Sequence, residues 1–73
     1  MHPEITYGIV ESFDPHRGLG IIDADGTKFL FHCAEISDGT RDIEVSARVS
    51  FVAVSRFGNW EASVVTLRAA ESS

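Results

Sequence analysis

Short apolar segments that alternate every second residue, each bounded by turn residues, are the feature that most constrains this fold. The first segment runs from residue 5 to residue 13 and places Ile5, Tyr7 and Ile9 on one parity. Such alternation, rich in β-branched and aromatic types, is typical of a β-strand. No segment of the chain shows a helical period over three turns. We therefore expect an all-β protein.

Four further strands are predicted between turns, over residues 19–23, 28–31, 49–54 and 60–67. In the last of these, Trp60, Ala62 and Val64 alternate on one parity. Residues 14–18 carry turn chemistry, because proline presets φ and glycine permits a positive φ. Asp25-Gly26 is a strong hairpin signal, and Gly58-Asn59 turns the chain again. One helical turn is expected over residues 33–36, followed by a polar loop over residues 37–44.

The chain is too short for more than one core. It has 73 residues, and a domain of this size buries only about 60% of the surface that its unfolded chain exposes. Five short strands do not make a sandwich with two full faces, but they close into a small barrel that leaves no free edge. We predict one domain over residues 1–73, a five-stranded antiparallel barrel of the oligonucleotide/oligosaccharide-binding (OB) type. The barrel spans about residues 5–67, and residues 68–73 form a short tail.

Charge and size limit the function. Eleven acidic residues against six basic ones give a net charge of −5, which works against phosphate affinity.

The small core argues against an enzyme, and no cofactor is expected. His2, His16 and His32 lack ligand-like spacing, so no metal site is predicted. The single Cys33 forbids an internal disulfide, and we expect its side chain to point away from that of His32. No apolar run approaches the length of a membrane span, so we expect a cytoplasmic protein without membrane contact.

From Tyr7 to Leu67 the sequence resembles a bacterial cold-shock protein. Residues 8–14, Gly-Ile-Val-Glu-Ser-Phe-Asp, are similar to that family's opening strand, Gly-Lys-Val-Lys-Trp-Phe-Asn. Residues 17–22, Arg-Gly-Leu-Gly-Ile-Ile, match the first ribonucleoprotein motif, Lys-Gly-Phe-Gly-Phe-Ile. Residues 29–33, Phe-Leu-Phe-His-Cys, match the second, Val-Phe-Val-His-Phe. The resemblance implies a cold-shock domain that binds single-stranded RNA or DNA by stacking bases on outer-face rings, with basic groups along the backbone.

Five of the family's stacking rings are replaced here by non-aromatic side chains, at Ser12, Leu19, Ile21, Leu30 and Cys33. The lysine before the lost tryptophan is an acidic residue, at position 11. Each base–aromatic stack contributes roughly 1–3 kcal/mol, so losing several removes on the order of 10 kcal/mol. A micromolar complex has only about 8 kcal/mol of binding free energy. The inherited binding is therefore weakened or altered.

Two functional hypotheses follow. The first is single-stranded nucleic-acid binding, RNA or DNA, through a set of eight residues: Phe13, Arg17, Leu19, Ile21, Leu30, His32, Phe57 and Trp60. Within this set Phe57 and Trp60 flank a turn beside Arg56 and offer a relocated stacking platform, unless Trp60 simply packs onto the end of the barrel. The second hypothesis is a protein-interaction module, or a homodimer, that uses the exposed aliphatic side chains of Leu19, Ile21 and Leu30.

Overall fold

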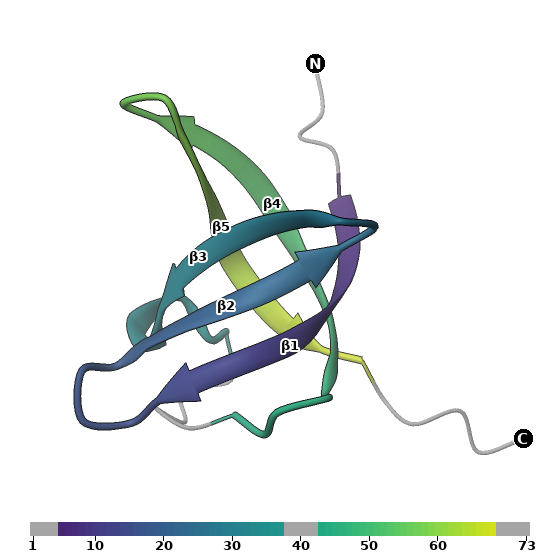
Figure 1. The fold of residues 1–73 in the computed structure, drawn as a ribbon. Coiled ribbons are helices and arrows are strands. Elements are labelled where there is room, and N and C mark those ends of the chain that lie inside the picture. The colour runs from purple at the N-terminus through teal and green to yellow at the C-terminus, as the bar shows by residue number, and fades with distance from the viewer. Residues whose placement is uncertain (1–4, 38–42, 69–73) are drawn as a thin grey trace, which may run out of the picture.

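Five strands close into a barrel in the computed structural model, which describes residues 5–37 and 43–68 (Figure 1). The strands are β1 (Ile5–Asp14), β2 (Leu19–Ala24), β3 (Thr27–His32), β4 (Arg48–Arg56) and β5 (Asn59–Leu67). A single turn of 3₁₀ helix, η1 (Cys33–Glu35), follows β3. The strand order is β1-β2-β3-β5-β4, and β4 pairs with β1 to close the ring. The predicted all-β barrel of five strands is confirmed.

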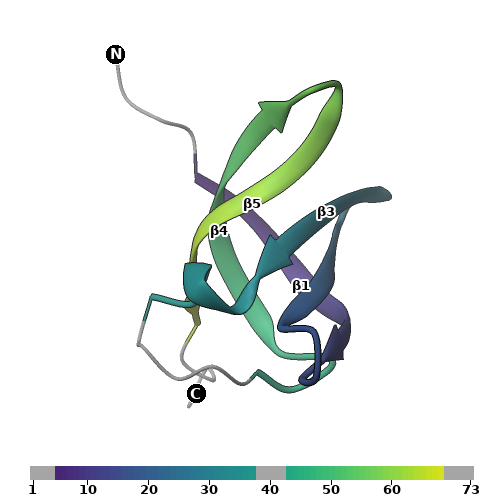
Figure 2. The ribbon, with the colours of Figure 1, turned by 90° about the vertical axis from the view of Figure 1, so that its left-hand side faces the viewer.

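Four of the five strand pairings are antiparallel, and the pairing of β3 with β5 is parallel, with Leu30 opposite Glu61. This difference from a wholly antiparallel barrel has a geometric reason. Strands around a ring alternate in direction only if their number is even, so a closed ring of five must contain at least one parallel pair. Only one residue pair joins β3 to β5, and the two strands diverge beyond it toward the protruding β4–β5 hairpin (Figure 2).

The core fills the barrel with the inward-facing side chains of every strand. On β2 and β3 the large buried side chains are Ile22, Phe29 and Phe31, which alternate along the strands with the outward-facing Leu19, Ile21 and Leu30. Phe29 packs against Phe51 of β4 with ring centroids 4.9 Å apart. The remaining buried apolar residues are Val10, Ala24, Ile36, Ile43, Val49, Ala62 and Val65. The barrel therefore has a single apolar interior to which every strand contributes.

A bulge in β5 breaks the simple alternation expected from the sequence. Val52 lies opposite Ser63, but Ser50 lies opposite Thr66, so β5 contains one extra residue. Val64 takes up this residue with a φ of +52°, which is rare for a β-branched side chain. The expected parity of Trp60, Ala62 and Val64 therefore ends at the bulge: Val65 is buried in place of Val64, which is exposed. A second bulge interrupts β1 between Val10 and Ser12.

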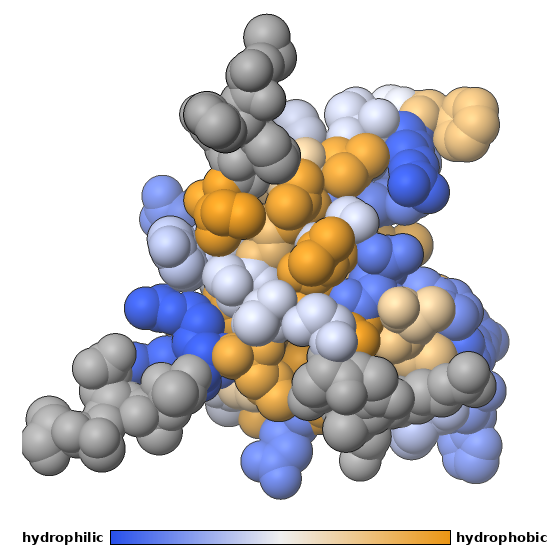
Figure 3. Space-filling model, turned by 180° about the vertical axis from the view of Figure 1, so that it is seen from behind, coloured by the Kyte–Doolittle hydropathy of each residue, from blue (hydrophilic) through white to orange (hydrophobic). Residues whose placement is uncertain are grey.

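The first half of β1 presents its larger apolar side chains to the outside. Ile5, Tyr7 and Ile9 are exposed, and hydrophobic residues also gather on the face of the barrel that is hidden in Figure 1 (Figure 3). Gly8 and Val10 lie on the parity of the strand that faces the core. A Cβ at Gly8 would lie only 2.6 Å from Ile22 Cγ2 of β2. β1 therefore lies too close to β2 for a side chain at this position.

Part of the expected loop and tail lies outside the described residues, namely 38–42 and 69–73. The expected helical turn is present as η1, which is one residue shorter than the predicted range 33–36. Among the described residues, no helix is long and apolar enough to cross a membrane.

Candidate nucleic-acid interface

Three aliphatic side chains lie together on the outer surface of β2 and β3. Ile21 is directly opposite Leu30, and Leu19 is opposite His32 in the antiparallel pair. Leu30 is 40% exposed, whereas Leu19 and Ile21 are half-buried. We call Leu19, Ile21 and Leu30 the aliphatic face. Its members occupy adjacent positions because β2 and β3 each place every second residue on this side.

A shallow hollow lies over β1 and β2 and is lined by Phe13, Arg17 and the whole aliphatic face. It therefore brings together five of the eight residues predicted for binding. Phe13 is half-buried, and its ring stacks on the core ring of Phe31 with centroids 5.9 Å apart and an interplanar angle of 11°. Arg17 is exposed, and its Nε lies 3.8 Å from the carboxylate of Asp14. We call this site the β1–β2 hollow.

A second hollow, the β3–β5 cleft, lies on the other side of Leu19 and Leu30 and shares these two residues with the first. His32 also lines it. The other lining residues are Phe31, Glu35, Val54, Arg56, Glu61, Ala62 and Ser63. The two hollows together form one continuous outer surface that runs from β1 across β2 and β3 to β5.

Glu35, Glu61 and Ser63 line the cleft without having been predicted as site residues, and Arg56 was expected only as a neighbour of the Phe57 and Trp60 rings. These residues join the cleft because of the parallel contact between β3 and β5, which connects segments about 30 residues apart. One local signal was present. Glu61 and Ser63 have the parity opposite to the apolar Trp60 and Ala62, which predicts that they face outward.

Glu35 is fastened to β5 by two hydrogen bonds. Its Oε1 accepts from the Ser63 hydroxyl at 2.9 Å and from the Val64 backbone N–H at 3.2 Å. The Val64 N–H, followed by the Ser63 hydroxyl, lowers the pKa of the Glu35 carboxyl, because both groups stabilise the ionised form. The cleft therefore contains a carboxylate that stays charged at neutral pH.

His32 ends β3 and caps η1. Its Nδ1 accepts a hydrogen bond from the Ala34 backbone N–H at 3.0 Å, so the neutral ring carries its proton on Nε2. The Cys33 Sγ lies 3.9 Å from the same Nδ1. This corrects the expectation that the two side chains point apart, which assumed a continuing strand, whereas Cys33 begins η1. Within residues 5–37 and 43–68, no three His, Cys, Asp or Glu side chains are grouped to hold a metal ion.

The two rings predicted as a relocated platform lie away from both hollows. Phe57 is fully exposed at the tip of the β4–β5 hairpin. Trp60 is half-exposed on the inward parity of β5, and its ring packs edge-to-face with that of Phe29, with centroids 5.7 Å apart. Neither residue lines the β1–β2 hollow or the β3–β5 cleft. Trp60 therefore packs against the end of the core.

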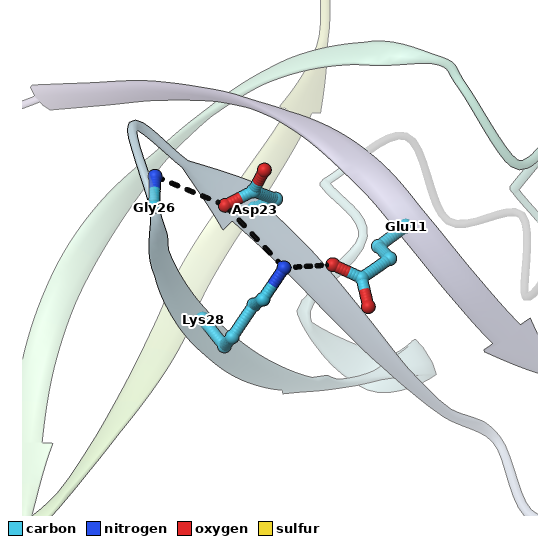
Figure 4. A network of polar contacts seen from close by, with 4 residues as sticks. All are labelled: Glu11, Asp23, Gly26 and Lys28. Carbon is cyan, nitrogen blue, oxygen red and sulfur yellow. Dashed lines mark hydrogen bonds and ion pairs between the residues drawn. The ribbon is translucent and has the colours of Figure 1, made fainter.

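Lys28 lies on the outer parity of β3, two residues before Leu30, and was not predicted as a site residue. Lys28 Nζ contacts the Glu11 carboxylate and lies 3.7 Å from Asp23 Oδ1, which also accepts from the Gly26 N–H at 3.1 Å (Figure 4). The hydrogen bond to Glu11 is the largest cause that raises the pKa of Lys28. Its positive charge is therefore offset by two carboxylates.

Solved structures of other proteins share this fold. The sequence matches no protein-family model, and no curated protein is significantly similar to it. The structure matches 37 solved chains, and one of these is Drosophila Unr CSD456, which contains cold-shock domains. The TM-score is 0.80 at 19% sequence identity, over 97% of this chain and 29% of the Unr chain. This chain thus spans less than a third of the Unr chain. Residues 5–37 and 43–68 therefore adopt the fold of a cold-shock domain, a closed OB-type barrel.

Proposed function

We propose that this chain binds single-stranded nucleic acid, weakly, along the outer surface of β2 and β3. The observation that carries the proposal is the continuity of the β1–β2 hollow and the β3–β5 cleft across Leu19 and Leu30. Six of the eight predicted residues line this surface. A strand of several nucleotides fits such a surface by placing bases on the apolar side chains and phosphates near Arg17. The role is binding rather than catalysis.

The composition of the surface sets the expected strength. Aliphatic side chains bury the face of a base but lack the ring stacking that adds about 1–3 kcal/mol per base. Arg17, Lys28 and Arg56 each lie within 4.0 Å of a carboxylate, which reduces their attraction for phosphate. We therefore expect a dissociation constant on the order of 100 μM at physiological salt, as in non-specific binding.

The test restores one ring. Leu30 is exposed enough to accept a larger side chain, so Leu30→Phe is expected to tighten binding to a labelled oligouridylate by about tenfold, the equivalent of one stack. Fluorescence anisotropy at low salt measures the change. Val45→Phe is the matched control, because Val45 is exposed but lines neither hollow, and it should leave the affinity unchanged. The proposal is overturned if neither the wild type nor Leu30→Phe binds at concentrations up to about 1 mM.

A second candidate function is favoured by the same ion pairs. A face whose cations are matched by carboxylates and whose centre is aliphatic also suits a protein partner, including a second copy of this chain. Sedimentation over a range of concentrations tests self-association, with Leu30→Asp as the disrupting variant. Association that Leu30→Asp abolishes supports this candidate. A species that is monomeric at every concentration rejects the homodimer.

A further inference from the structure

The β3–β5 cleft contains an open ion pair together with a second carboxylate, Glu35, whereas the β1–β2 hollow contains only the pair of Asp14 and Arg17. Arg56 Nη1 lies 3.7 Å from Glu61 Oε1, and the two side chains are 59% and 35% exposed. At this separation the pair makes no direct hydrogen bond, so both groups keep the capacity to bind a ligand. Leu19 and Leu30 line the same cleft and provide an apolar surface beside the pair.

The charges of the cleft favour a neutral ligand group over a phosphate. Glu35 and Glu61 contribute two carboxylates against the single guanidinium of Arg56. Both hydrogen bonds that fasten Glu35 to β5 go to its Oε1, so this carboxylate is held in place at the cleft. A phosphate in the cleft would meet more negative than positive charge. The part of a bound strand that enters is therefore uncharged, and of the uncharged parts only a base presents a flat face to Leu30 and an edge with several donors and acceptors to the ion pair.

Among the four bases, guanine matches the ion pair. Its Watson–Crick edge carries an acceptor, O6, followed by two adjacent donors, N1–H and the N2 amino group. A carboxylate accepts two such parallel donors as it does from an arginine fork. Uracil offers one donor between two carbonyl oxygens, which a carboxylate repels, and adenine and cytosine place a ring acceptor beside their amino group.

We propose that the β3–β5 cleft is a guanine subsite, in which Glu61 accepts from N1–H and N2–H, Arg56 donates to O6, and Leu30 packs against the base. This inference rests on the proposed binding of single strands and adds a base preference to it. Glu61 and Arg56 are the residues that determine specificity. The aliphatic face and Arg17 supply the part of the affinity that does not depend on sequence.

The test compares an oligouridylate with the same strand carrying one central guanine or one central inosine. We expect the guanine strand to bind about tenfold more tightly than the uridine strand, which is the discrimination that one bidentate hydrogen-bonded contact typically gives. Inosine lacks the N2 amino group and should bind with intermediate affinity. Glu61→Gln removes the carboxylate but preserves its shape, and it should bring the ratio of guanine to uridine affinity close to one.

The ratio is the decisive quantity, because removing a negative charge tightens the binding of every strand. Glu44→Gln makes the same charge change at an exposed residue that does not line the cleft, and it should leave the ratio unchanged. Equal affinity for the guanine and uridine strands overturns the subsite but leaves the proposed function standing. Absence of binding to any strand overturns the proposed function itself.

Free guanosine monophosphate tests whether the cleft binds guanine within a nucleic-acid strand or as a free mononucleotide. It should compete only weakly with the guanine strand, because it makes no contact with the β1–β2 hollow. A mononucleotide that binds as tightly as the strand would contradict the assignment of the cleft to a base within a nucleic acid.

Discussion

At the scale of single residues, the barrel requires a glycine where β1, β2 and β3 approach one another closely. Gly20 of β2 lies opposite both Phe13 and Phe31 in the two strand pairings. A Cβ at Gly20 would lie 2.5 Å from Cε1 and Cζ of Phe31 and 2.8 Å from the Ser12 carbonyl oxygen. Gly20 has no positive φ, so the requirement for glycine here is purely steric. The same close approach lets Phe13 stack on Phe31.

Gly20→Ala is therefore expected to destabilise the protein by about 1–3 kcal/mol, the usual cost of overpacking a core. Chemical denaturation of the wild type and the variant measures the difference in the free energy of unfolding. Phe31→Leu removes the ring atoms that the new methyl group would meet, so the cost of Gly20→Ala should be smaller in that background. Equal costs in both backgrounds would show that Phe31 is not the obstacle.

At the scale of secondary-structure elements, η1 is attached to β5 rather than to the strands that flank it in sequence. Ile36 bridges to Val65, and the Ser37 N–H donates to the Val65 carbonyl oxygen at 2.7 Å. The Glu35 carboxylate adds its bonds to Ser63 and Val64. These contacts hold the end of β3 beside β5, where the two strands share only one residue pair. The geometry of the β3–β5 cleft therefore depends on Glu35.

Glu35 makes stability depend on pH in the acidic range. Its pKa is lowered in the folded protein from the ordinary value of 4.5, so its stabilising contribution is present above about pH 4.5 and is lost as the pH falls through the folded pKa. Glu35→Gln should lower the free energy of unfolding by about 1 kcal/mol at pH 7, the typical contribution of a hydrogen bond. Denaturation at a series of pH values should show the two proteins converging in acid. A difference that stays constant down to pH 3 would contradict this role.

The elements also show how far the sequence predicts the structure. Alternation and turn residues are local signals, so the five strands and the inward parity of Phe29 and Phe31 were predictable. The β5 bulge at Val64 and the parallel β3–β5 contact depend on closing the ring, which no local pattern encodes. The predictable part of the candidate site is accordingly the aliphatic face, with Phe13, Arg17 and His32, which the matched motifs indicated. Glu35 and Glu61 escaped prediction because only ring closure brings them together.

At the scale of the whole molecule, the net charge of −5 opposes the approach of any polyanion. The distribution of charge matters as much as its total. Three cations that border the candidate interface are each close to a carboxylate, and Lys28 is close to two, Glu11 and Asp23. A phosphate that approaches Lys28 therefore competes with Glu11 and Asp23 for its ammonium group. The cations of the candidate interface are therefore engaged in ion pairs within the chain, which limits the salt-dependent part of the binding free energy.

Releasing Lys28 should strengthen binding to a single strand. Glu11→Gln removes the principal partner of Lys28, so one more cation is available to a phosphate, and the slope of log affinity against log salt concentration should steepen by about 0.7 for a single strand. Anisotropy titrations of an oligouridylate between about 50 and 200 mM salt measure this slope. Glu44→Gln changes the net charge equally but frees no cation of the interface, so it should raise the affinity slightly without changing the slope. If both variants steepen the slope alike, total charge rather than the pairing of Lys28 controls binding.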